Sequence, residues 1–254
     1  MAALGLPVLV ALAVLGLVAG VGITAIGPGG VLATIGVFAL TGLSPAQVAG
    51  TAIATHVATG LVGTAAYTRS GQLREPETRR TAGILAVAAV VGTPLGVLVN
   101  SAVSGQAFGI LLGLFVALVA GLVWYRELRA APERRGHPPV AAVAALGFGV
   151  AGVSGIVGVG GPMLAVPLLV VLGVPVLEAL AASQAQSVVI AGVGTLGYLA
   201  HGAIDWPLAV LVGVPELAGV LVGWALARAL PTRALKVALV SSLLAVAPYL
   251  ALHG

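Results

Sequence analysis

Long apolar segments separated by short polar breaks run along the whole chain. Eight of these segments are rich in Ala, Leu, Val and Gly and are long enough to cross the roughly 30 Å hydrocarbon core of a bilayer as α-helices. The expected membrane helices are residues 4–24, 46–67, 81–102, 105–126, 140–157, 177–200, 206–230 and 236–252. A membrane β-barrel would instead alternate apolar and polar residues over strands of about 10 residues. The pattern therefore predicts an all-α polytopic membrane protein.

Two shorter apolar segments, residues 30–42 and 162–173, each follow a cluster of glycines. The clusters read Gly27-Pro28-Gly29-Gly30 and Gly158-Val159-Gly160-Gly161. At about 1.5 Å per residue, a helix of either length covers close to 20 Å and cannot cross the bilayer alone. We expect both segments to be re-entrant or to form part of broken, tilted helices.

The two glycine clusters are 131 residues apart, and the same offset aligns much of the chain with itself. The matches include Gly42 with Gly173, Gly63 with Gly194, Thr64 with Thr195, Tyr67 with Tyr198, Gly71 with Gly202 and Gly92 with Gly223. This duplication predicts two homologous repeats of four to five helices, residues 1–126 and 140–254, joined by a cytoplasmic linker at 127–139. Hydrophobic chains that are duplicated and broken at matching places are typical of transporters.

The charged residues are few and unevenly placed. The chain is 60% hydrophobic and 7% charged, whereas an average soluble domain is about 25% charged. Eight of the eleven basic residues lie in two loops: Arg69, Arg74, Arg79, Arg80, Arg126, Arg129, Arg134 and Arg135. This distribution follows the positive-inside rule and gives no indication of a nucleic-acid partner. It predicts a multi-pass protein of the cell (inner) membrane, surrounded by the lipid bilayer, with both loops in the cytoplasm.

The same rule bears on the short segments. If 162–173 crosses the membrane, the basic residues Arg228, Arg233 and Lys236 also reach the cytoplasmic side. The protein then has ten segments in two inverted repeats of five. If 162–173 is re-entrant, there are eight crossings and the repeats are parallel. The charge distribution favours the inverted arrangement.

The glycine clusters are the first candidates for a binding site. A helix that begins after Gly30 or Gly161 points unpaired backbone N–H groups and its positive dipole end at whatever lies in front of it. Such a site favours an anion, and glycine lets the backbone approach it closely. The candidate ligands are Gly29, Gly30 and Val31 in one repeat and Gly160, Gly161 and Pro162 in the other. The alternative is that the glycines only permit tight helix packing.

The helices after the short segments carry neutral polar residues at matching depth, which could donate hydrogen bonds to an oxyanion. The candidates are Thr51, Thr55 and His56 in the first repeat and Ser183, Gln184, Gln186 and Ser187 in the second. The alternative is that these groups bond to neighbouring helices or to their own backbone.

Two ionisable residues, His56 and Glu216, lie well inside expected membrane helices. Ionisable groups at such positions are commonly functional. A protonated His56 could pair with an anion or relay a proton, and Glu216, next to Pro215, could couple a substrate to protons. Each could equally be a structural partner of a neighbouring helix.

Enzyme motifs are absent from the sequence. It has no cysteine, no phosphate loop with its lysine, no pair of histidines at metal-ligand spacing and no nucleophile motif. We therefore expect no catalytic activity, no cofactor and no metal, and transport that is secondary or passive rather than ATP-driven.

Taken together, these features resemble the TauE/SafE family of sulfite and organosulfonate exporters over nearly the entire chain. The residues that carry the resemblance are Gly27–Gly30, Gly50-Thr51-Ala52, Tyr67 and Gly71, then Gly158–Pro162, Ala182-Ser183, Tyr198 and Gly202-Ala203-Ile204. The resemblance implies a permease for a small sulfur-containing or carboxylate anion. We expect a secondary transporter that rocks one repeat against the other, with proton coupling and a homodimer left open. The alternative function is a passive anion channel on the same scaffold.

Overall fold

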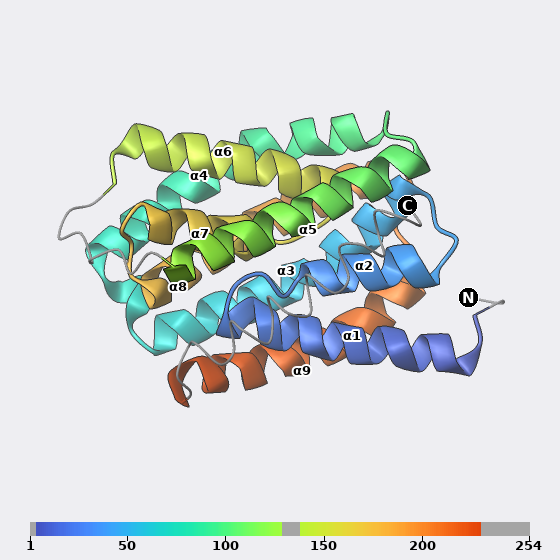
Figure 1. The fold of residues 1–254 in the computed structure, drawn as a ribbon, viewed down its shortest axis with the longest axis horizontal. Helices are drawn as coiled ribbons and strands as arrows, with labels where there is room; N and C mark the ends of the chain where they lie inside the picture. Colours follow the sequence, from blue (N-terminus) through green and yellow to red (C-terminus); the bar gives the residue numbers. More distant parts are fainter. Residues whose placement is uncertain (1–3, 129–137, 230–254) are drawn as a thin grey trace.

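The computed structural model describes residues 4–128 and 138–229, which form nine α-helices and one 3-10 turn (Figure 1). The first repeat contains α1 (Leu6–Ala25), α2 (Val31–Leu40), α3 (Pro45–Arg69), η1 (Gln72–Arg74), α4 (Pro76–Asn100) and α5 (Gly105–Leu128). The second contains α6 (Val140–Val157), α7 (Pro162–Val171), α8 (Val176–Ala200) and α9 (Trp206–Ala229). The all-α prediction is confirmed, and the expected segments agree with these helices within a few residues. The expected helix 236–252 and most of the linker lie outside the described residues.

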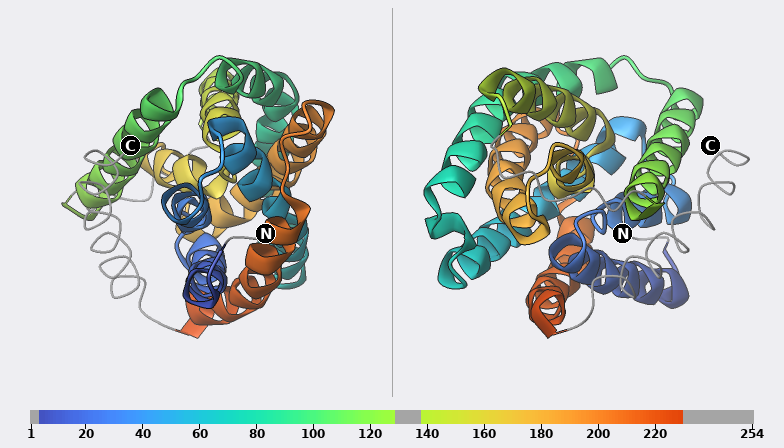
Figure 2. Two further views of the ribbon diagram at one scale, coloured as in Figure 1. Left: turned by 90° about the vertical axis from the view of Figure 1, so that its right-hand side faces the viewer. Right: turned by 60° about the vertical axis from the view of Figure 1, so that its left-hand side comes forward.

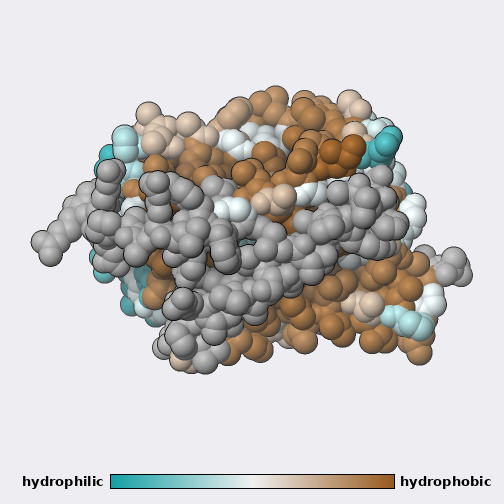
Figure 3. All heavy atoms as spheres, in the orientation of Figure 1, coloured by the Kyte–Doolittle hydropathy of each residue, from teal (hydrophilic) through white to brown (hydrophobic). Residues whose placement is uncertain are grey.

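The outer surface of the helices suits a lipid environment. Within residues 4–128 and 138–229, six helices are long and apolar enough to cross a membrane, namely α1, α3, α4, α6, α8 and α9. Large apolar side chains such as Val10, Val87, Leu98, Leu196 and Val214 are at least half exposed. On the part of the face in Figure 3 that is not grey, hydrophobic residues cover the upper and lower sides, and hydrophilic residues gather at the two ends of the long axis. A water-facing surface would not expose so much contiguous apolar area.

The two short helices, α2 and α7, are 10 residues each and begin directly after the glycine clusters. The chain turns sharply before each of them at corresponding positions. Gly27 has φ = 110° and Gly158 has φ = 77°. Side chains other than glycine rarely adopt this left-handed conformation, which explains a glycine at the start of each cluster.

The first helix of each repeat packs against a helix of the other repeat, α1 against α9 and α6 against α4, and the offset of 131 residues relates α4 to α9. In the α1–α9 pair, methyl groups added to Gly16, Gly20 and Gly223 would collide with the backbone of Val212, Glu216 and Val21, respectively. In the α4–α6 pair, Gly92 and Gly96 lie in the same way against the carbonyl groups of Phe148 and Gly152. Residue numbers rise together along both pairs, so the paired helices run parallel. Glycine lets the backbones approach this closely, as in other membrane helix pairs.

Helices α3 and α8, which correspond in the duplication, cross at the centre of the molecule (Figures 1 and 2). A methyl group on Gly63 would lie 2.7 Å from Gln184 Oε1, and one on Gly194, the counterpart of Gly63, would collide with Ile53, the counterpart of Gln184. The contact is thus reciprocal. Because residue numbers rise along α3 as they fall along α8, these two helices run antiparallel.

A pair of tyrosines forms equivalent hydrogen bonds in the two repeats. Tyr67 Oη donates to the carbonyl of Thr24, and Tyr198 Oη donates to the carbonyl of Gly155, both at 2.7 Å. Each bond ties the middle helix of a repeat to the end of its first helix. The offset of 131 residues relates both donors and both acceptors, so the duplication extends to individual hydrogen bonds.

We expect the variants Tyr67→Phe and Tyr198→Phe to lower the free energy of unfolding by similar amounts, about 1–2 kcal/mol each. The reason is that each change leaves a buried carbonyl without its donor. Thermal unfolding in detergent measures the effect, and the double variant should show the sum of the two losses. Wild-type stability in either single variant would contradict the prediction.

Candidate functional site

His56, in the middle of α3, lies where the two glycine clusters meet. A methyl group placed on Gly30 would lie 2.7 Å from His56 Nε2, and one placed on Gly160 would lie 3.2 Å from His56 Cδ2. The same methyl group on Gly160 would lie 2.7 Å from Ser187 Oγ, and Ser187 is the counterpart of His56 in the duplication. Clusters from both repeats therefore border one buried centre.

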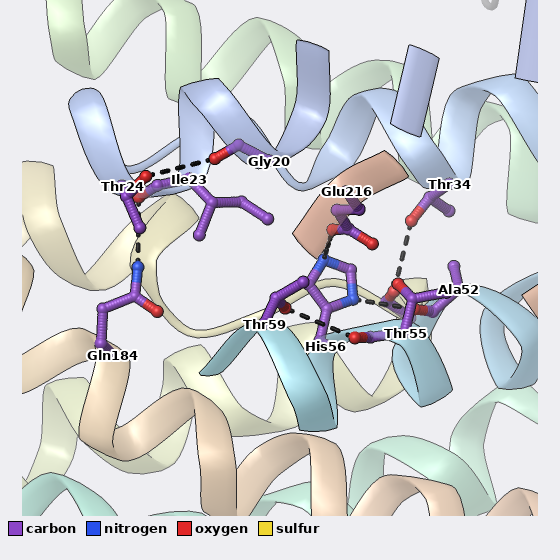
Figure 4. A network of polar contacts seen from close by, with 11 residues as sticks. Gly20, Ile23, Thr24, Thr34, Ala52, Thr55, His56, Thr59, Gln184 and Glu216 are labelled. Atoms are coloured by element: carbon purple, nitrogen blue, oxygen red, sulfur yellow. Dashed lines mark hydrogen bonds and ion pairs between the residues drawn. The ribbon is translucent and has the colours of Figure 1, made fainter. Parts of the chain in front are cut away.

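The imidazole of His56 faces the carboxylate of Glu216 from α9 (Figure 4). Nε2 lies 3.4 Å from Glu216 Oε1, and the two side chains are 1% and 0% exposed. His56 Nδ1 lies 2.8 Å from the carbonyl oxygen of Ala52. Because a carbonyl only accepts hydrogen bonds, Nδ1 carries a hydrogen, and the remaining nitrogen points at the carboxylate. Two lone pairs facing each other would repel, so the pair holds one further proton, on the imidazole or on the carboxyl group.

The packing of α9 fixes the position of Glu216. Gly20 of α1 lies directly against its backbone carbonyl, and Gly213, one turn earlier, lies against the side chain of Thr55 on α3. Pro215 is inside the helix and cannot donate the usual N–H bond to the preceding turn. The carboxylate is thus held between α1 and α3, next to the position where its own helix lacks a backbone hydrogen bond.

The glycine clusters contain backbone amides without a backbone hydrogen-bond acceptor. Within the described residues, the amides of Gly29, Gly30 and Val31 have no backbone acceptor, and neither do those of Gly160, Gly161 and Met163. All six residues are buried. Pro162 is the first residue of α7 and has no N–H, so it shapes the helix start and Met163 supplies the next amide. Unpaired amides at two helix starts are suited to an anion.

Comparison with known protein families agrees with this geometry. The family described as "Sulfite exporter TauE/SafE" matches residues 12–250. The chain belongs to the TauE/SafE family. The family is described as one of exporters, and the long apolar helices of this chain fit a multi-pass membrane protein.

Two curated relatives of this TauE/SafE protein are described as "Probable membrane transporter protein", from Xylella fastidiosa strains 9a5c and Temecula1 / ATCC 700964. Each is 30% identical over 159 residues, which cover 61% of this chain and 59% of the relative. No solved structure matches the chain significantly.

The polar side chains of α3 that were expected at the anion mostly form local hydrogen bonds in this TauE/SafE protein. The hydroxyl groups of Thr55 and Thr59 donate to carbonyl groups of α3 itself, those of Ala52 and Thr55. Thr51 Oγ1 accepts the amide of Asp205 at 2.9 Å and so holds the loop before α9. Thr55 and Thr59 thus bond locally, as the alternative describes. Thr51 only accepts in its bond to Asp205 and keeps a hydrogen to donate, so its contact with an anion stays a prediction.

The polar residues of α8 are divided between structural and central positions. Ser183 donates to the carbonyl of Ala179 in its own helix. Gln184 Nε2 donates to the carbonyl of Ile23, and Gln186 Nε2 donates to that of Gly147. The side-chain oxygens of both glutamines have no donor within the described residues, and Gln186 Oε1 lies 3.2 Å from a methyl position on Gly161. Ser187 and Gln186 thus adjoin the second cluster.

Sequence reasoning missed two links at this site. It treated His56 and Glu216 separately, although two ionisable groups buried in one membrane protein commonly pair with each other. It also missed Thr34 of α2, whose hydroxyl donates to the carbonyl of Gly158 at 3.2 Å and joins the first repeat to the second cluster. No sequence signal identified Thr34, because a single threonine in a short apolar helix is unremarkable.

Proposed function

We propose that this chain is a secondary transporter that carries a small oxyanion, sulfite or a related organosulfonate, across the cytoplasmic membrane. The observation that supports it most directly is the convergence of both glycine clusters on His56. The amides at the starts of α2 and α7 would donate to the oxygens of the anion, while a protonated His56 would supply positive charge. The family description favours a sulfur oxyanion, whose oxygens are good acceptors for such donors.

Two hollows at opposite ends of α3 support access from both sides. One, of about 560 Å³, is lined by Thr64, Thr68 and Ala185 together with Arg74 and Arg79. The other, of about 360 Å³, is lined by residues that include Ser44, Gln47 and Tyr198. His56 lies between them, about 12–14 Å from each along the helix. The arginine side chains would attract anions to the hollow on the side of the basic loops.

The antiparallel crossing of α3 and α8 supports an inverted relation between the two repeats. The packing also suggests which parts move. Helix α9 contacts α3 and α1 closely, and α4 contacts α8 and α6 closely, so each compact half contains helices of both repeats. Alternating access would then move the group α1, α3 and α9 against the group α4, α6 and α8. This replaces the simpler expectation that one sequence repeat rocks against the other.

The proposal predicts saturable uptake of radiolabelled sulfite into proteoliposomes that contain the purified full chain. Sulfite inside the vesicles should accelerate uptake, because a carrier exchanges faster than it returns empty. Ohmic currents without saturation or acceleration by internal sulfite would show a channel instead. An absence of flux for sulfite, sulfoacetate and small carboxylates would refute anion transport altogether. The variant Gly192→Ala controls for the effect of substitution itself. It should transport sulfite like the wild type, because its new methyl group meets no neighbouring atom within 4 Å.

A further inference from the structure

The carboxylate of Glu216 occupies the side of His56 that an anion would need. It lies 3.4 Å from Nε2, the one imidazole nitrogen that does not bond to Ala52. We propose that Glu216 is a resident anion of the binding centre, which the transported anion replaces only after the carboxylate has accepted a proton. This inference rests on the proposed transport of an anion through the centre and adds how that transport is coupled.

His56 is the charged partner of the Glu216 carboxylate. The neutral hydroxyl of Thr55 also lies within hydrogen-bonding reach of the carboxylate, although it donates to the carbonyl of Ala52 at 2.8 Å. The attraction between opposite charges is therefore what His56 adds to keep the carboxylate in the centre. A carboxylate that loses its charge has little reason to remain there.

Among the residues that the structure describes, no other charged group at the centre could hold a second anion. Helices α1, α2 and α7 carry no titratable side chain. Helix α8 carries Glu178 in its first turn and Tyr198, whose hydroxyl donates to Gly155. Helix α3 carries Tyr67, bonded to Thr24, and Arg69 in its last turn. One imidazolium thus faces either the carboxylate or a substrate anion, since two anions side by side would repel each other.

The charge balance defines the coupling. In the empty state, the imidazolium and the carboxylate cancel. In the loaded state, one proton from water binds a carboxyl oxygen of Glu216, and one monovalent anion faces the imidazolium, so the charges cancel again. Both states keep the buried centre neutral and avoid the cost of an unpaired charge in the membrane. A proton and an anion must then move together in the same direction, one for one.

The test measures sulfite and proton movement in the same proteoliposomes, with radiolabelled sulfite outside and a pH-sensitive dye inside. For the wild-type protein we expect an inward proton gradient to drive sulfite accumulation, and a sulfite gradient to acidify the lumen. Sulfite flux without proton movement would overturn the coupling while leaving anion transport intact. Absence of sulfite flux would instead contradict the proposed function, so the two failures are distinguishable.

The variant Glu216→Gln imitates the protonated acid permanently. We expect it to exchange sulfite across the membrane without accumulation and without proton movement. Accumulation driven by the proton gradient in this variant, or loss of sulfite exchange in a variant that unfolds at the wild-type temperature, would overturn the proposal. Glu178→Gln is the matched control, because its carboxylate lies at the start of α8, away from His56, and coupling should persist. If Glu216→Gln does not fold, the number of protons that the wild-type protein moves with each sulfite ion still tests the proposal.

Discussion

Replacing His56 by glutamine is expected to reduce sulfite transport by about 10- to 100-fold. A hydrogen bond to a charged group contributes about 1.5–3 kcal/mol, and loss of the imidazolium removes the positive charge that faces the anion. The same change leaves the carboxylate of Glu216 buried without a charged partner, and breaking a buried ion pair typically destabilises a protein by about 3–5 kcal/mol. Proteoliposome flux and thermal unfolding measure the two effects separately.

The double variant, with His56→Gln and Glu216→Gln, separates the role of the pair in folding from its role in transport. Two neutral amides can bond to each other, so the double variant should regain most of the lost stability while transport stays low. If the single His56→Gln variant transports sulfite at the wild-type rate, His56 does not bind the anion. If the double variant is less stable than both single variants, the two side chains do not form the pair described above.

Adding one methyl group at Gly20 is expected to destabilise the protein by about 2 kcal/mol and to abolish most transport. The Gly20→Ala methyl would overlap the backbone carbonyl of Glu216 and lie 2.9 Å from the amide nitrogen of Val220. Since backbone atoms cannot turn aside, α1 and α9 must separate, at the cost usual for overpacking. The separation moves Glu216 away from His56, so stability and transport should fall together.

Two further variants make this prediction specific. Gly96→Ala produces a similar overlap with the carbonyl of Gly152 in the α4–α6 pair, which does not carry Glu216. It should lower stability as much as Gly20→Ala but change the coupling to protons less. Gly83→Ala, with no atom within 4 Å of the new methyl, should be neutral or slightly stabilising because alanine favours helix. Equal behaviour of Gly20→Ala and Gly83→Ala would disprove the close α1–α9 contact.

The sequence predicted the helices well for a physical reason. Membrane helices must satisfy all backbone hydrogen bonds internally, so their limits follow from the lengths of apolar runs. The short helices α2 and α7 were predicted from glycines, because Gly27 and Gly158 adopt a conformation that other residues avoid. The inverted orientation of the two repeats was inferred only from the distribution of basic residues. It stays a prediction, which the antiparallel crossing of α3 and α8 supports.

The partners of the polar side chains could not be predicted in this way. Periodicity places Thr51 and Thr55 on one face of a helix, but it does not say whether a hydroxyl faces a cavity, a loop or its own backbone. The same limit explains why Gln184 and Gln186 were expected at the anion, whereas their amide groups bond to α1 and α6. The buried pair His56–Glu216 depends on contact between α3 and α9, which only the tertiary structure reveals.

The parallel pairing of α1 with α9 has a consequence for biosynthesis. Gly16 and its contact Val212 are 196 positions apart in the chain, so α1 leaves the ribosome long before its main partner exists. Contacts between such distant segments form late and leave surfaces uncovered during synthesis. The face of α1 that carries Gly16 and Gly20 therefore stays uncovered in the membrane until α9 has been synthesised and inserted. Neither repeat contains the main packing partner of its own first helix, and a chain that stops before α9 would leave this face open to other helices or to quality control.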